Sequence, residues 1–364
     1  MTFLNRGAAN ISARVSAALQ RPAICHGEPE FAALLHGIRG KLLKAFVPGS
    51  ETDYTAVVLT GSGSTAIEAA LLSSLPHGKR ILVINNGVYG EQLASIIGVH
   101  RLGVAEFKLD WSTRPDPEKL RLALRQHPEV YAVAMVHHET TTGLINPVKE
   151  IAEVVDSQNR VFIVDSVSGL GGEALDIAGL HLYMVAGAPE ECMPGVPGVS
   201  FVLVRKGFME RMKTYPKRSW YLHLPHYYES EEKGNIPFTP AAQVYCAFDE
   251  ALTELLEEGV ANRILRYRKA ATVIRHKMKA LGLKPVLPEE FQSNSLTAYH
   301  LPDGVPYQAL HDKLKDQGYL IHPGQGPLES KIFRVAHMGT LTQTDLQGFL
   351  SAFQRVMESA KVLS

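Results

Sequence analysis

The sequence has few of the features that mark secreted, membrane-spanning or nucleic-acid-binding proteins. It contains only three cysteines, Cys25, Cys192 and Cys246, without the spacing of a disulfide framework or a zinc finger, so we expect reduced, buried thiols. No apolar run approaches the roughly 20 residues of a membrane span, and the N-terminus lacks the apolar core of a signal peptide. The 37 basic and 37 acidic side chains cancel, which gives no electrostatic reason to expect nucleic acid or an anionic membrane as a partner. These absences favour a cytoplasmic protein that recognises a small ligand.

What the sequence does contain is the alternation of apolar strands and helices that is typical of an α/β protein. Its 364 residues, 45% of them hydrophobic, suffice for about two domains with substantial cores. β-branched runs predict strands over residues 57–59, 81–84, 130–136 and 161–164, and helical patterns begin near residue 66, after residue 90 and at residue 148. The expected fold is a doubly wound, mostly parallel sheet, whose ligand-binding groups gather at the carboxyl ends of the strands.

The second half of the chain predicts a smaller α+β domain. Aromatic and basic residues fill positions 215–228, a charged loop is expected at 229–235, and one long helix is expected over residues 241–281. Short strands follow at 296–300, 319–322 and 332–335, with helices from about residues 307 and 342. We expect the large domain to span residues 16–245, and the small domain to combine residues 1–15 with residues 246–364.

Two polar motifs stand where predicted strands end. The segment TGSGST, residues 60–65, lies between a strand and a helix, where backbone N–H groups, hydroxyls and the helix N-terminus suit a phosphate. A plain helix-capping turn is an equally good interpretation of this segment. Asp165 ends the strand 161–164, where a desolvated carboxylate needs a cationic partner such as a protonated pyridine nitrogen. The alternative is an aspartate that caps the following turn.

Further candidates follow other strand ends. His137 and His138 open the segment HHETTTGLINP, but consecutive residues leaving a strand point in opposite directions, which argues against a shared metal ion. The threonines and the acid of this segment suit a hydroxyl or oxyanion, or simply cap the strand end. Tyr89 in NNGVYG offers an aromatic face to a planar ring, or packs as an ordinary tyrosine. Arg334 in KIFRVAHMG has the guanidinium fork that binds carboxylate or phosphonate, although an ion pair is its commoner role.

In this order and spacing, the motifs resemble the class V, fold-type I pyridoxal-phosphate aminotransferases, and among these the 2-aminoethylphosphonate–pyruvate transaminases. The resemblance covers nearly the whole chain. It is carried by the segments RPAICHGEPEF, LTGSGSTAIEA, INNGVYGEQ, MVHHETTTGLINP, FIVDSVSGLGG, CMPGVPGVSFVLVR, NIPFTP and FRVAHMG. It implies a large α/β domain with a mostly parallel, seven-stranded sheet and a small C-terminal α+β domain.

The same resemblance implies a role for individual residues. The residues implied to contact the cofactor, pyridoxal 5′-phosphate or pyridoxamine 5′-phosphate, are Ser62, Gly63, Ser64 and Thr65 at its phosphate, Tyr89 over its ring, Thr141 at its hydroxyl, Asp165 at its ring nitrogen and Thr239 at the phosphate of a partner subunit. The shared site implies a homodimer. Arg334 would bind the carboxylate or phosphonate of an amino acid or aminophosphonate, and Asn5 would belong to the N-terminal substrate loop.

The chain departs from this family at the residue that normally holds the cofactor. Relatives read roughly Ser-Ser-Ala-Asn-Lys-Cys before GVPG, whereas residues 187–192 here read Gly-Ala-Pro-Glu-Glu-Cys, and no lysine lies between Lys149 and Lys206. Glu191 therefore stands at the predicted Schiff-base position, and a carboxylate cannot condense with an aldehyde. The departure predicts non-covalent cofactor binding.

Three hypotheses about function follow from this departure. In the first, the cofactor binds non-covalently, and Glu191, Glu190 or His137 acts as the base in an altered reaction. In the second, the protein is a catalytically inactive relative that binds a ligand or partners an active paralogue. In the third, the pocket hosts chemistry without pyridoxal on a metal held by Glu190, Glu191 and a histidine, either His137 or His138, although this spacing is not a recognised metal motif. We favour the first, because ring-binding and phosphate-binding positions have little reason to persist together without a cofactor.

Overall fold

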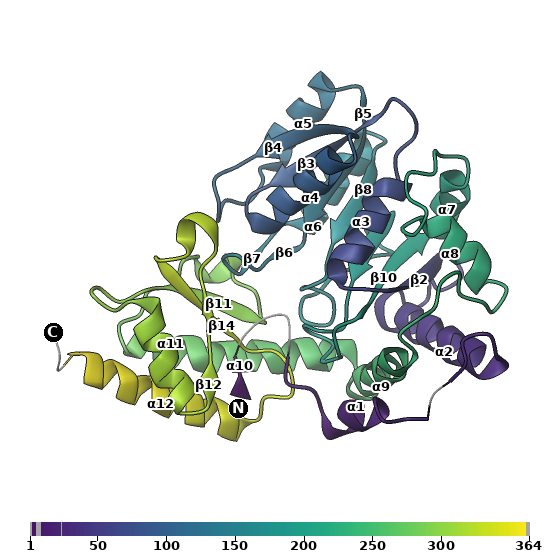
Figure 1. Ribbon diagram of the computed structural model, residues 1–364. Helices are drawn as coiled ribbons and strands as arrows, with labels where there is room; N and C mark the ends of the chain where they lie inside the picture. Colours follow the sequence, from purple (N-terminus) through teal and green to yellow (C-terminus); the bar gives the residue numbers. More distant parts are fainter. Residues whose placement is uncertain (1, 5–8, 23, 362–364) are drawn as a thin grey trace.

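The computed structural model describes residues 2–4, 9–22 and 24–361, and Figure 1 shows their arrangement. A seven-stranded sheet forms the centre of the larger part, with strand order β2-β10-β9-β8-β5-β3-β4. In that order, the strands are β2 (Tyr54–Thr60), β10 (Val199–Arg205), β9 (Met184–Gly187), β8 (Val161–Asp165), β5 (Val130–Val136), β3 (Arg80–Asn85) and β4 (Gly103–Lys108). Strand β10 is antiparallel to both of its neighbours, and the other pairings are parallel. The predicted α/β fold with a mostly parallel seven-stranded sheet is confirmed.

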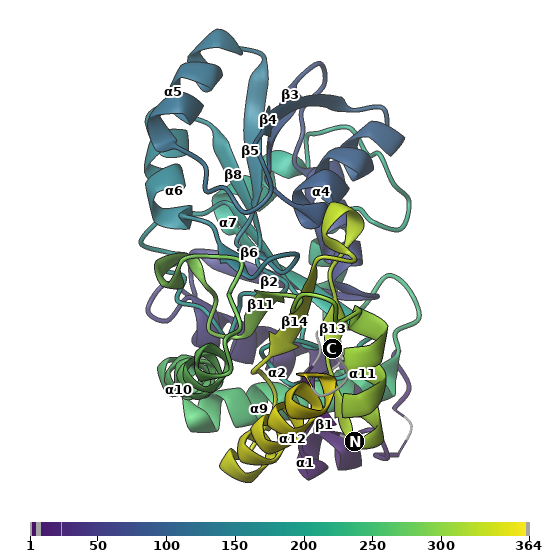
Figure 2. The same ribbon diagram turned by 90° about the vertical axis from the view of Figure 1, so that its left-hand side faces the viewer.

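Helices cover both faces of this sheet. One face packs against α2 (Pro29–Phe46), α5 (Pro117–Gln126), α6 (Val148–Ser157) and α9 (Ala242–Glu258). The other packs against α3 (Gly63–Ser73), α4 (Val88–Val99), α7 (Lys206–Met212) and α8 (Leu224–Glu231). Figure 2 shows α5 and α6 on the opposite side of the strands from α4. Strands buried on both faces need apolar residues at successive positions, which is why β5 reads VYAVAMV.

Alternation along β5 assigns each side chain to one face. Val133 and Met135 belong to the core on the α5–α6 face, whereas Ala134 and Val136 belong to the core on the α3–α4 face. The same rule puts Val164 of β8 on the α5–α6 face and Ile163 on the other. This alternation decides which face of the sheet each residue at a strand end supplies.

The C-terminal part builds a third core of its own. The long helix α10 (Val260–Ala280) leads into a three-stranded sheet, and two further helices pack on it. These elements are β11 (Leu296–His300), β14 (Ile332–Ala336), β13 (His322–Pro323), α11 (Tyr307–Asp316) and α12 (Gln343–Lys361). Strand β1 (Thr2–Phe3) pairs with β12 (Tyr319–Leu320), and α1 (Ala13–Ala18) packs on α9, so both ends of the described chain lie on this side of the molecule (Figure 1).

Several sequence predictions need correction. The single helix expected over 241–281 is wrong: it breaks into α9 and α10 at Gly259, whose φ of 83° lies in the left-handed region that favours glycine. Helix α3 begins at Gly63 rather than near residue 66, and α8 extends into the predicted charged loop as far as Glu231. Cys192 and Cys246 are buried as expected, but Cys25 is exposed. No helix among the described residues is both long and apolar enough to cross a membrane.

At the open edge of the sheet, side chains make hydrogen bonds with backbone groups of β2. The N–H of Val58 donates to Glu231 Oε1 at 3.0 Å, and Arg39 Nε donates to the carbonyl of Ala56 at 2.9 Å. Arg39 Nε also lies 3.4 Å from Glu231 Oε2. Burial raises the pKa of Glu231 to about 8, and the charge of Arg39 opposes that rise. Helices α2 and α8 therefore replace the missing neighbouring strand with one acid and one arginine.

Replacing Glu231 with alanine should lower the free energy of unfolding by about 2–4 kcal/mol, because a buried N–H and a largely buried guanidinium lose their partner. Urea unfolding followed by circular dichroism measures the change. Glu232→Ala is the matched control: Glu232 also pairs with Arg39, but its side chain is 48% exposed, and we expect a loss below about 1 kcal/mol. Equal losses in the two variants would contradict the proposed edge-sealing role.

Candidate functional site

The candidate site lies where the carboxyl ends of β5, β8 and β9 meet the N-termini of α3 and α4. Asp165 is the last residue of β8, and Tyr89 lies in the first turn of α4. The segment that follows β5 forms two short strands, β6 (His138–Glu139) and β7 (Leu144–Ile145), which pair with each other. Crossover connections bring strand ends and helix starts to the same edge, as expected for a doubly wound sheet.

A carboxylate and a hydroxyl hold the N-terminus of α4. Glu139 Oε2 accepts the backbone N–H groups of Tyr89 at 3.2 Å and Gly90 at 3.3 Å. The Thr141 hydroxyl donates to Glu139 Oε1 at 2.5 Å and accepts the N–H of Val88 at 3.1 Å. A β-carbon at Gly87 would lie 2.4 Å from the carboxyl carbon of Glu139, so this approach requires glycine. These hydrogen bonds hold Tyr89 at the site, and the Thr141 hydroxyl takes part in them both as a donor and as an acceptor.

Asp165 is a buried carboxyl group, and none of the described residues brings a cation close enough to affect its pKa. Its side chain is 7% exposed, and it accepts one hydrogen bond, from the N–H of Val167 at 3.0 Å. Burial raises the pKa of Asp165 to about 7, the Val167 N–H opposes this, and the charge of Glu139 adds to it. No cation among the described residues contributes to that pKa. A ligand that brings a positive group to Asp165 would therefore be bound more tightly than a neutral one.

The four predicted phosphate residues surround the N-terminus of α3. Ser62 is the N-cap of the helix and makes no side-chain cap bond, while Gly63 begins the helix against the side chain of Val167. Thr65 donates its N–H to the carbonyl of Ser62 at 2.8 Å, and Ser64 Oγ accepts a hydrogen bond from Gln92 Nε2 at 3.0 Å. Val167 therefore connects the α3 terminus to Asp165, two residues earlier in the chain.

Glu190 and Glu191, in the loop after β9, are both buried, with exposed fractions of 8% and 5%. Burial raises the pKa of Glu190, whereas its own N–H and the N–H of Gly63 stabilise the charged form and oppose this rise. The N–H of Gly63, the first residue of α3, therefore influences the pKa of Glu190. Burial raises the pKa of the Cys192 thiol most, and the charge of Glu191 raises it further. Glu190 is thus related electrostatically to the start of α3, and Glu191 to Cys192.

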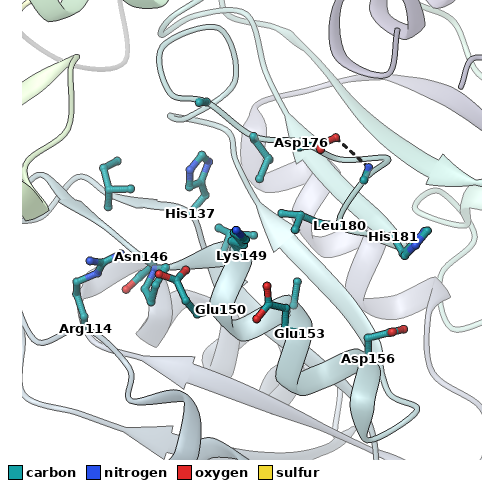
Figure 3. A pocket seen from close by; sticks show the side chains of 17 residues that line it. Arg114, His137, Asn146, Lys149, Glu150, Glu153, Asp156, Asp176, Leu180 and His181 are labelled. Atoms are coloured by element: carbon teal, nitrogen blue, oxygen red, sulfur yellow. Dashed lines mark hydrogen bonds between the residues drawn. The ribbon is translucent and has the colours of Figure 1, made fainter. Parts of the chain in front are cut away.

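His137 is not brought to the face that carries Asp165. It continues β5 on the α5–α6 side, where Nδ1 is 2.9 Å from Ser166 Oγ, and burial lowers its pKa to about 3. It lines a cavity of about 640 Å³ with Asn146, Lys149 and Glu150, shown in Figure 3.

His138 places Nδ1 3.0 Å from the carbonyl oxygen of Ser168, and burial lowers its pKa to about 4. Within residues 2–4, 9–22 and 24–361, no group of three His, Cys, Asp or Glu side chains is arranged to hold a metal ion.

The predicted substrate residue Arg334 is buried in β14 and reaches toward the large part of the chain. Its Nε donates to the carbonyl of Pro323 at 2.8 Å, and its Nη1 donates to the carbonyl of Thr140 at 2.9 Å and to Gln325 Oε1 at 3.0 Å. Thr140 adjoins Glu139 and Thr141 of the α4 cap. Arg334 therefore lies next to the site and is braced by backbone carbonyls.

The remaining predicted residues lie at the margins. Thr239 is exposed in the loop between α8 and α9. Asn5 lies outside the described residues, and Ala9 donates its N–H to the carbonyl of Glu190 at 3.1 Å, so Ala9 lies against the loop after β9. Glu173 was missed by the sequence reasoning: it accepts hydrogen bonds from Asn294 N at 2.5 Å and from Asn294 Nδ2 at 2.8 Å. These partners are 121 residues apart, and no local pattern marks such a pair.

Comparison with known proteins gives one consistent answer. Residues 14–326 match the family model described as aminotransferase class-V. The chain is 38% identical to the 2-aminoethylphosphonate–pyruvate transaminase of Syntrophobacter fumaroxidans over 98% of this chain and 96% of that one. Among solved structures, it is similar to an aspartate aminotransferase of Thermus thermophilus, with a TM-score of 0.90, 25% identity and 99% of each chain covered. A pyridoxamine–pyruvate aminotransferase of Mesorhizobium loti gives a TM-score of 0.90 with 26% identity, over 99% of this chain and 93% of that one.

Replacing Asp165 with asparagine should remove one source of pH dependence from the stability of the ligand-free protein. The folded-state pKa near 7 lies above the ordinary value of 3.8, so the folded chain keeps a proton that the unfolded chain releases between these values. This contribution is complete below pH 4 and is lost as the pH rises toward 7, with a slope of about 1.4 kcal/mol per pH unit. Urea unfolding at pH values from 4.5 to 7.5 in both proteins measures the difference. Identical slopes would mean that Asp165 is already ionised in the folded protein.

Proposed function

The chain belongs to the class-V aminotransferase family, and from that premise we propose that it binds pyridoxal 5′-phosphate or pyridoxamine 5′-phosphate non-covalently. Its substrate in this proposal is a small amino acid or an aminophosphonate, as the name of the Syntrophobacter relative suggests. The reaction proceeds without a Schiff-base lysine, because Glu191 stands at that position. The protein acts as a cytoplasmic homodimer in which the exposed Thr239 reaches the partner subunit's site.

The observation that carries this proposal is the environment of Asp165. Asp165 is a buried carboxyl group with a pKa near 7, and no cation among the described residues contributes to that pKa, so it is complementary to a ring nitrogen that is protonated when bound. Tyr89, fixed in the first turn of α4, supplies an aromatic face of the size of a pyridine ring. These two features support binding of the cofactor ring, and the N–H of Gly63, at the proposed phosphate end, opposes the rise that burial causes in the pKa of Glu190.

In this proposal, three residues hold the cofactor ring, bind the substrate and move its proton. When bound, the cofactor ring stabilises negative charge that develops at the amino-bearing carbon of the substrate. Asp165 keeps the ring nitrogen protonated, and Arg334 binds the carboxylate or phosphonate of the substrate. Glu191 is the residue that we assign to move the substrate proton, because it stands where the family has its lysine and is buried. His137 is a weaker candidate for that task, since it lies on the α5–α6 face.

A second candidate function is a catalytically inactive relative that binds a ligand or pairs with an active subunit. One observation favours it: Glu190 is a buried acid whose pKa is raised by burial and lowered by the N–H of Gly63, and Gly63 begins the helix at which a cofactor phosphate would be expected. The persistence of Asp165, Tyr89 and the α4 cap favours the first candidate. The metal-dependent alternative has no supporting ligand cluster among the described parts of the chain.

Adding pyridoxal 5′-phosphate to the purified protein should give a shifted absorbance spectrum and saturable binding. Borohydride treatment followed by intact-mass analysis should leave the protein mass unchanged at this site, because no lysine is available there to be fixed to the ligand. Asp165→Asn should weaken binding by about ten- to a hundred-fold, through the loss of a charge-assisted hydrogen bond. Pyridoxamine 5′-phosphate should give the same ranking of variants.

Lys149→Ala is the matched control for this experiment, because Lys149 lines the cavity on the opposite face of the sheet and should leave binding unchanged. A saturating mass increase after borohydride would overturn non-covalent binding. Absence of binding of either form at millimolar concentration would overturn the first candidate and leave the inactive relative.

A further inference from the structure

A cavity of about 650 Å³ lies in the C-terminal part of the chain. One wall is the second half of α10, and the other is formed by residues 282–292, which lead into β11. Strand β11 lies beside α10 (Figure 1), and its Tyr299 also lines the cavity. A cavity of this volume has the size of a small-molecule site.

The charges that line this cavity are mostly positive. Arg275, Lys279 and Lys284 line it, together with His276 and one acid, Glu289. The chain as a whole has equal numbers of acidic and basic side chains, so this excess is local. Lys279 and Lys284 are exposed, and neither forms an ion pair with a residue that the structure describes. An anion that enters the cavity would therefore meet cations that can pair with it.

The end of α10 does not account for all of these cations. Lys279 lies in the last turn of the helix, where the helix dipole favours a positive charge. Arg275 precedes that turn, and Lys284 follows the helix. A carbonyl at this helix end is already paired, because Leu283 donates its N–H to the carbonyl of Met278 at 3.0 Å. The cations therefore gather around the cavity for a reason other than helix capping.

Two polar groups of the cavity can donate hydrogen bonds to an anion. Arg275 Nε donates to Thr297 Oγ1 at 2.9 Å and its Nη2 donates to the carbonyl of Ser293, which fixes the guanidinium. Tyr299 is 1% exposed, and its hydroxyl makes no hydrogen bond of normal geometry within the described part of the chain. Burial raises the pKa of Tyr299, and the charge of Arg275 and the hydroxyl of Thr297 oppose that rise. A guanidinium and a phenol that line one cavity suit a carboxylate or a phosphate.

The rest of the lining is largely apolar. Leu283 and Leu287 are only 6% and 4% exposed, and Pro285 and Pro288 lie between and beside them in the same wall. An apolar surface of this kind suits a hydrocarbon or aromatic group. A ligand with one anionic end and an apolar body therefore fits the cavity better than an inorganic ion.

We propose that this cavity is a second ligand site, separate from the candidate active site, and that it binds a small organic acid. The carboxylate or phosphate of the acid pairs with Arg275, Lys279 and Lys284, and its apolar body packs on Leu283 and Leu287. The inference does not depend on the proposed function, because none of these residues takes part in it.

The cavity adjoins the candidate site through the backbone. Gln292, which lines the cavity, pairs with Leu144 in an isolated β-bridge. Ser293 donates its N–H to the carbonyl of Gly143 at 2.9 Å, two residues after Thr141. A ligand in the cavity would therefore lie against the residues that hold the segment of Thr141, but outside the candidate site.

NMR saturation-transfer titrations with benzoate and phenyl phosphate test the inference, with benzamide as the neutral analogue. At least one of the two anions should bind saturably, about ten-fold or more tightly than benzamide. The tighter of the two identifies the acid group that the site prefers. In the double variant Lys279→Gln/Lys284→Gln, anion affinity should fall about five-fold or more, with benzamide binding unchanged. Tyr299→Phe, which removes only the hydroxyl, should weaken the anion about three-fold or more.

Lys269→Gln/Lys277→Gln is the matched control, because both lysines lie on α10, neither lines the cavity, and the same charge is removed. It should change anion affinity less than about two-fold. Circular dichroism checks that each variant is folded. Equal losses in the two double variants would show an effect of net charge and would overturn the inference. Anion binding that is unchanged in Lys279→Gln/Lys284→Gln would place the anion elsewhere, for example at Arg334, and would also overturn it.

Two results in the wild type alone would contradict the inference as well. Benzamide that binds as tightly as both anions would mean that the cavity selects an apolar group and not an acid. Absence of saturable binding of both anions at millimolar concentration would mean that the cavity is not a site for organic acids. Neither result would bear on the binding of pyridoxal 5′-phosphate at the candidate site.

Discussion

Glu139, a carboxylate of the protein itself, caps the N-terminus of helix α4 at the edge of the sheet where the candidate site lies. Its Oε2 accepts the N–H groups of Tyr89 and Gly90, and the Thr141 hydroxyl donates to its Oε1. The cap meets a general physical need, because the first N–H groups of a helix lack partners within it. The rest of the site depends on this contact, which fixes the tyrosine face and the position of Thr141.

This solution leaves the site rich in negative charge. Asp165, Glu139, Glu190 and Glu191 are all buried, and burial raises the pKa of both Asp165 and Glu190. A protein that buries several carboxyl groups usually places a cation beside them, because the cation offsets the cost of removing their charge from water. Arg334, beside the site, donates hydrogen bonds to the carbonyls of Thr140 and Pro323. No cation among the described residues contributes to the pKa of Asp165, so a positively charged ligand group would be favoured there.

Much of the fold could be predicted from the sequence, because β-branched runs and small residues at strand ends are local signals. The strand ending at Asp165 and the turn before the helix at residues 60–65 are examples, and the family match supports the same fold. The break at Gly259 could not be predicted with equal ease, since a glycine inside an amphipathic pattern is compatible with a continuous helix. The orientation of His137 follows from strand alternation only once the last residue of β5 is known. The hydrogen bonds between Glu173 and Asn294 join residues 121 positions apart in the chain, and no periodicity indicates such a contact.

The adjacent acids Glu190 and Glu191 are best understood as two different groups. The N–H of Gly63 opposes the rise that burial causes in the pKa of Glu190, whereas the charge of Glu191 adds to the rise that burial causes in the pKa of the Cys192 thiol, so a change at one position does not reproduce a change at the other. In the proposed function, these buried acids favour the pyridoxamine form of the cofactor over the pyridoxal form, because the amine carries an ammonium group in addition to the protonated ring nitrogen. The segment from Gly187 to Glu191 differs from the family pattern while Cys192 matches it, and the proposal assigns the orientation of the ring to Asp165, which lies outside that segment.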